Sequence, residues 1–64
     1  MTEKELLYLE DAVGHEKNII SICDESINML DDSNLVSFFE DEKELHNGIL
    51  SKLMSLLEGK VDEK

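Results

Sequence analysis

The stretch LLYLEDAVGHEKNIISICDESINML, Leu6–Leu30, predicts the fold of this chain. Intervals of three and four residues alternate along a seam of eight positions: Leu6, Leu9, Val13, Glu16, Ile20, Cys23, Ile27 and Leu30. This is the heptad spacing of helices that pack along their length, and only Glu16 is not apolar. Other apolar residues widen the stripe on one side: Tyr8, Ala12, Ile19, Ile22 and Met29. A stripe this broad is typical of a helix in a bundle.

The ends of this helix and the start of the next also have sequence signals. Thr2 and Glu5 have the spacing of a capping box, which predicts a helix start near residue 3. The run DDSN, Asp31–Asn34, interrupts the apolar pattern with residues that favour caps and turns, and we expect Asp32 or Ser33 to cap the second helix.

The second helix repeats the heptad pattern. We expect its seam to consist of seven residues: Leu35, Phe39, Glu42, His46, Ile49, Leu53 and Leu56. Phe38, Leu45, Leu50 and Leu57 widen this stripe as well. Gly59 suits the position after a helix end, so we expect the helix to stop near residue 58 and the last five residues to fray.

The fold class predicted from these patterns is all-α, with residues 1–64 forming a single helical-hairpin domain. Its parts are a helix over about 3–30, a turn over about 31–34 and a helix over about 35–58. A linker this short makes the two helices antiparallel neighbours. Because each helix keeps apolar surface that the other cannot cover, we expect a homodimer that forms a four-helix bundle.

Composition narrows the classes of function. A 64-residue chain buries little surface alone, and Cys23 is its only cysteine, so a disulfide within the chain cannot stabilise it. The net charge of −10 argues against nucleic acid and anionic membranes as partners, because both would repel it. No segment resembles a signal peptide or a membrane span, and we expect a cytoplasmic protein.

Three polar residues lie at seam positions where apolar residues are expected: Glu16, Glu42 and His46. In an antiparallel hairpin they fall at nearby levels, and Glu42 is one turn from His46 on the same helix face. One interpretation is a structural polar layer that sets register and oligomeric state. The other is a metal site for iron or manganese at the bundle core, although di-iron bundles use Glu-x-x-His and this helix has Glu42-x-x-x-His46.

His15 is a further candidate ligand, because it borders the same stripe beside Glu16. A histidine at the wet edge of a bundle is the alternative. We do not expect an enzyme with nucleophilic chemistry, because no serine is arranged with a histidine and an acid, and no Gly-rich phosphate loop is present.

The stretch KELLYLEDAVGHEKNI, Lys4–Ile19, resembles the opening of the coat F family of spore coat proteins. The resemblance rests on a LYLEDA-type run at Leu7–Ala12, on GHEK at Gly14–Lys17, and on His46 following the aromatic pair Phe38 and Phe39. It implies a small ferritin-like helical hairpin from a spore-forming bacterium, with a place in the spore coat and other coat proteins as partners.

Overall fold

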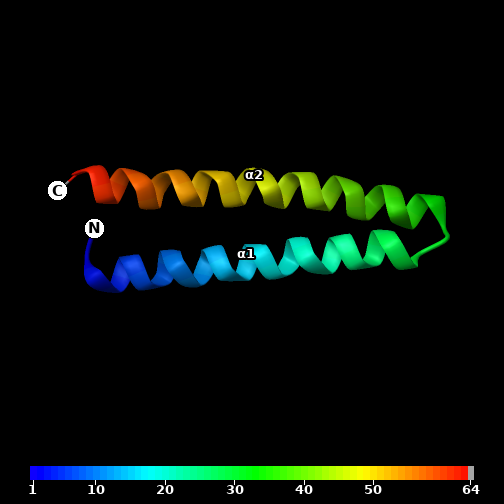
Figure 1. The fold of residues 1–64 in the computed structure, drawn as a ribbon, viewed down its shortest axis with the longest axis horizontal. Helices are drawn as coiled ribbons and strands as arrows, with labels where there is room; N and C mark the ends of the chain where they lie inside the picture. The colour runs from blue at the N-terminus through cyan, green and yellow to red at the C-terminus, as the bar shows by residue number, and fades with distance from the viewer. Residues whose placement is uncertain (64) are drawn as a thin grey trace.

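Two long helices packed side by side make up the computed structural model of this chain (Figure 1), which describes the backbone of residues 1–63 and the side chains of residues 1–59. Helix α1 spans Glu3–Met29 and helix α2 spans Ser33–Glu63. The helices run antiparallel, so both chain ends lie together, opposite the turn (Figure 1). The predicted all-α helical hairpin is confirmed.

Local hydrogen bonds define three of the helix ends. At the start of α1, the Glu5 N–H donates to Oγ1 of Thr2 and the Thr2 N–H donates to Oε1 of Glu5, which completes the predicted capping box. The Leu30 N–H bonds the Ser26 carbonyl as α1 ends. Oδ1 of Asp32 accepts from the N–H groups of Asn34 and Leu35, so Asp32 caps α2, as expected.

Helix α2 is longer than the sequence pattern suggested. It continues through Gly59 to Glu63 instead of ending near residue 58. A glycine in a helix interior costs about 1 kcal/mol relative to alanine, and no proline follows that would end the helix. The expected fraying of residues 60–64 stays a prediction, and Lys64 lies outside the described residues.

The seam of α1 faces α2 as predicted, whereas the seam of α2 is rotated. Val13 and Cys23 of α1 are buried, and the other six predicted seam positions of that helix are half-buried. On α2, the expected seam residues Leu35, Ile49 and Leu56 are exposed. The inward positions are instead seven half-buried residues: Val36, Phe39, Lys43, His46, Leu50, Leu53 and Leu57. We call these two inward rows the inner seam.

Most of the exposed apolar side chains form a second row, which we call the outer seam. Eleven large apolar side chains are exposed in the part of the chain whose side chains are described, and eight of them repeat at heptad spacing beside the inner seam. Those on α1 are Tyr8, Ile22 and Met29; those on α2 are Leu35, Phe38, Leu45, Ile49 and Leu56. The hairpin therefore carries an apolar stripe on each helix that its own partner helix leaves uncovered.

The hairpin is also elongated and thin. Its dimensions are 49 × 15 × 12 Å, and its radius of gyration is 14.7 Å, whereas a compact domain of this length would have about 11 Å. The chain exposes 4952 Å², compared with about 4200 Å² for a folded monomer of this mass. The difference, about 750 Å², is close to the ~800 Å² that each partner contributes to a standard interface.

Candidate functional site: a carboxylate–imidazole layer beside an apolar face

His46 and Glu16 meet across the two helices near the middle of the hairpin. Nδ1 of His46 lies 2.5 Å from Oε1 of Glu16, so the two side chains are hydrogen-bonded. Both side chains are mostly covered, with 19% of His46 and 14% of Glu16 exposed. The sequence pattern predicted this contact, because both residues occupy inner-seam positions at neighbouring levels.

Glu42 reaches the other nitrogen of the same ring. Its Oε1 lies 3.6 Å from Nε2 of His46, one helical turn away on α2, and 37% of its side chain is exposed. Glu42 lies between Phe38 and Leu45 in the heptad spacing of the outer seam, so its carboxylate is on the outer-seam side of the His46 ring. The three predicted site residues are thus brought together, with His46 between two carboxylates; we call them the polar layer.

The chemistry of the polar layer is that of one imidazole shared by two carboxylates. A protonated ring donates from both nitrogens and can satisfy Glu16 and Glu42 together, whereas a neutral ring donates from only one. Every buried side-chain nitrogen and oxygen within the described residues has a hydrogen-bond partner. Glu16 and His46 thus form a satisfied polar contact between the helices, and the layer contains no nucleophile.

The same three residues do not fit a resident metal ion within one hairpin. One ring nitrogen already faces Glu16, so only Nε2 of His46 and the Glu42 carboxylate remain to share an ion. Zinc sites have at least three protein ligands, and iron and manganese sites in bundles use several carboxylates. Over the described part of the chain, no group of three or more His, Cys, Asp or Glu residues is arranged to hold a metal.

His15, the further candidate ligand, is not part of this layer. It lies one residue before Glu16 and is exposed, in line with Tyr8, Ile22 and Met29 of the outer seam. The structure thus gives His15 a position on the apolar face at the edge of the hairpin.

A second polar contact between the helices was not anticipated. Nζ of Lys43 lies 2.5 Å from Oδ1 of Asp24, and both side chains are partly exposed. Lys43 holds an inner-seam position that the predicted seam assigned to its neighbour Glu42, and the aliphatic stem of a lysine can cover apolar surface while its amine reaches solvent. The sequence places Asp24 eight residues before Asp32 and Lys43 eleven residues after it, an offset of ~4.5 Å that these side chains can close.

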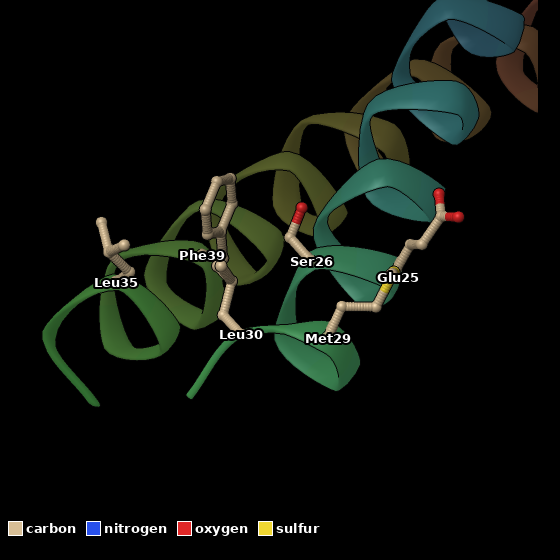
Figure 2. A pocket seen from close by; sticks show the side chains of 6 residues that line it. All are labelled: Glu25, Ser26, Met29, Leu30, Leu35 and Phe39. Atoms are coloured by element: carbon tan, nitrogen blue, oxygen red, sulfur yellow. The ribbon is translucent and has the colours of Figure 1, made fainter. Parts of the chain in front are cut away.

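Near the turn, the apolar face is hollowed into a groove of about 500 Å³. Its lining comes from both helices and the cap of α1, as Figure 2 shows: Glu25, Ser26, Met29, Leu30, Leu35 and Phe39. Met29 and Leu35 belong to the outer seams of different helices, so the two outer seams lie on the same side of the hairpin here. Both keep a heptad repeat, and they therefore form one apolar face along the molecule.

The search for relatives gives no family: no known protein family, curated protein or solved structure matches this chain. Neither α1 nor α2, over the residues described, combines the length and the apolar character needed to span a bilayer.

Proposed function

We propose that this chain is a small structural protein that works by self-association, as a two-fold dimer of hairpins that forms a four-helix bundle. The observation that carries the proposal is the outer seam. Eight large apolar side chains repeat at heptad spacing on one side of the hairpin, and they stay exposed in a single chain.

The occupant of this face is a second copy because its pattern matches itself. A heptad row packs best against another heptad row, since each side chain then enters a hole between four residues of the facing helix. A two-fold dimer supplies two such rows from the same surface and closes the assembly without leaving a free apolar face. The excess exposed surface of the chain is also close to the area that one partner of a standard interface covers.

The polar layer is suited to fixing the register of the helices in this assembly. Glu16 and His46 interrupt two apolar rows at one level, so a shift of α1 against α2 by one heptad would leave each of them facing apolar side chains. Buried polar residues in helical bundles set register and oligomeric state in this way. Glu42 extends the layer to the face on which the second copy packs.

The cellular setting follows from the resemblance of Lys4–Ile19 to the coat F family. We propose a protein of a spore-forming bacterium that takes part in the spore coat with other coat proteins. The acidic surface, with a net charge of −10, suits assembly with basic partners and disfavours nucleic acid. Fluorescent tagging during sporulation tests this setting independently of the oligomeric state.

The proposed self-association can be tested with two leucines of equal exposure. Leu45 is in the outer seam and Leu7 is outside it, and each is 56% exposed in the hairpin. We expect Leu45→Glu to convert the dimer to a monomer, because it places charge in the interface, whereas Leu7→Glu leaves the dimer intact.

The measurement is molar mass by light scattering at micromolar concentration, with circular dichroism to confirm that both variants are helical. Equal effects of the two substitutions on mass would contradict the proposed interface. A wild-type mass of one chain would remove the proposal altogether.

A further inference from the structure

Building on the proposed self-association, we infer that the two hairpins pack antiparallel, with the turn of each copy beside the open end of the other. The open end is where both chain ends lie (Figure 1). In this arrangement Lys52 of each copy approaches Glu42 of the other, and Tyr8 of each copy enters the groove beside the turn of the other.

Two-fold symmetry leaves two ways to bring the apolar faces together. If the axis runs along the helices, both turns lie at one end and α1 of one copy faces α2 of the other. If the axis runs across the helices, the turns lie at opposite ends, and each helix faces its own equivalent in the second copy. The charges and the shape of the face distinguish these arrangements.

The charges of the outer seam favour the antiparallel arrangement. Glu42 lies ten residues beyond Asp32 and Lys52 lies twenty, which places them ~15 and ~30 Å along α2 from the turn. Helices of 27 and 31 residues are ~40 and ~46 Å long. Reversing the second copy therefore brings its Lys52 to the level of Glu42, in two symmetric pairs.

The other arrangement gives Glu42 no such partner. With both turns at one end, each Glu42 would face α1 of the second copy at the level of Ile22, which lies ten residues before Asp32, so a carboxylate would meet an apolar side chain. Lys52 would be ~15 Å further along the helix, and Lys43 is already bound to Asp24 of its own hairpin. A carboxylate enclosed against apolar side chains without a cation disfavours that mode of docking.

The groove beside the turn independently favours the antiparallel arrangement of the two hairpins. Ser26, six residues before Asp32, lines the groove and is a small residue between Ile22 and Met29 of the outer seam. At ~9 Å from the turn it falls level, in the antiparallel arrangement, with Tyr8 of the second copy, which lies ~36 Å from its own turn. Tyr8 is 64% exposed. An aromatic ring fits the apolar walls, and its hydroxyl can bond Ser26 or Glu25 at the edge.

Disulfide trapping between mixed variants tests the arrangement, in a Cys23→Ala background that removes the native thiol. Mixing the Tyr8→Cys chain with the Ser26→Cys chain under a glutathione redox buffer is expected to give a covalent heterodimer. Mixing Ser26→Cys with Phe38→Cys, residues that face each other only if both turns lie at one end, is expected to give none. Mass spectrometry identifies the linked pair.

The outcomes separate this inference from the proposed function. If the Cys23→Ala protein is dimeric but the Ser26–Phe38 pair is trapped instead, the orientation is wrong and the dimer stands. If the Cys23→Ala protein has the mass of one chain, the proposed function fails first.

Charge reversal provides a check that needs no cysteine. Lys52→Glu is expected to raise the dimer dissociation constant by roughly tenfold or more, and adding Glu42→Lys is expected to restore it. Lack of any effect of Lys52→Glu on dissociation would overturn the proposed Glu42–Lys52 contact.

Discussion

Nδ1 of His46 on α2 lies 2.5 Å from Oε1 of Glu16 on α1, and this contact joins the two helices near their midpoints. Glu42 faces the other nitrogen of the same ring. Enclosing one imidazole between two carboxylates costs desolvation free energy. The contact forms only when the two helices are aligned in this register, so it fixes that register.

The first prediction concerns the coupling between these two residues. In a double-mutant cycle of Glu16→Ala and His46→Ala, we expect a coupling of about 1–2 kcal/mol in the free energy of unfolding, because removing either partner leaves the other covered and unpaired. Urea unfolding at a fixed protein concentration measures it. Strictly additive effects would show that the two side chains do not interact in solution.

The ion pair of Lys43 and Asp24 provides the matched control for that cycle. It also joins α1 to α2, but 38% and 49% of the two side chains are exposed. Solvent screening and the entropy of holding long side chains reduce such pairs to about 0.2–1 kcal/mol. We expect a smaller coupling here than for Glu16 and His46, and it should weaken further in high salt.

The second prediction separates a structural polar layer from a metal site. Replacing Glu16, Glu42 and His46 together with leucine should keep the dimer and leave its stability unchanged or higher, since apolar replacement of enclosed polar groups is often neutral or favourable. Fe(II), Mn(II) and Zn(II) should not raise the melting temperature of the wild type.

A metal-dependent rise would contradict this account, because a ligand that binds only the folded state stabilises it by RT ln(1 + [L]/Kd). The triple variant is the control for that result. A rise that the triple variant abolishes would assign the polar layer to metal binding, whereas a rise that persists would place the ion elsewhere.

The third prediction concerns the cap of α2. Asp32→Ala should lower the free energy of unfolding by about 1 kcal/mol, because it removes the acceptor for the N–H groups of Asn34 and Leu35. Asp31→Ala changes the same charge one residue earlier and serves as the control. Chemical denaturation of both variants is the measurement, and equal losses would mean that net charge in the turn, and not the cap, matters.

The fourth prediction uses a glycine inside α2. Gly48 is exposed, and a Cβ built there meets nothing within 4 Å. Gly48→Ala should therefore raise the free energy of unfolding by about 1 kcal/mol, through helix propensity alone. Gly48 lies on the side of α2 opposite the inner seam, one turn from Leu45 of the outer seam, and a single added methyl group should leave the dimer intact. A destabilised or monomeric variant would show that this side is covered in the assembly.

The hairpin was predictable from the sequence because helix periodicity, the capping box and the turn residues all favour one architecture. The contact between Glu16 and His46 was predictable too, since both break inner-seam positions that an antiparallel pairing brings to similar levels. These features depend on spacing along the chain, which the sequence records directly.

The rotation of α2 was not predictable, for a local reason. Apolar residues occur there as adjacent pairs, such as Leu35 with Val36 and Ile49 with Leu50. Each pair offers two seams one residue apart, and both satisfy the heptad spacing. The structure turns Val36 and Leu50 inward and leaves Leu35 and Ile49 on the outer seam. With two apolar seams available on one helix, packing against α1 decides which one faces inward.

Self-association is tested by the mass of the wild-type chain at micromolar concentration, measured by sedimentation equilibrium. We expect twice the chain mass of 7.3 kDa, because a second copy covers the outer seam. A compact, cooperatively folded species at the mass of a single chain would contradict this expectation.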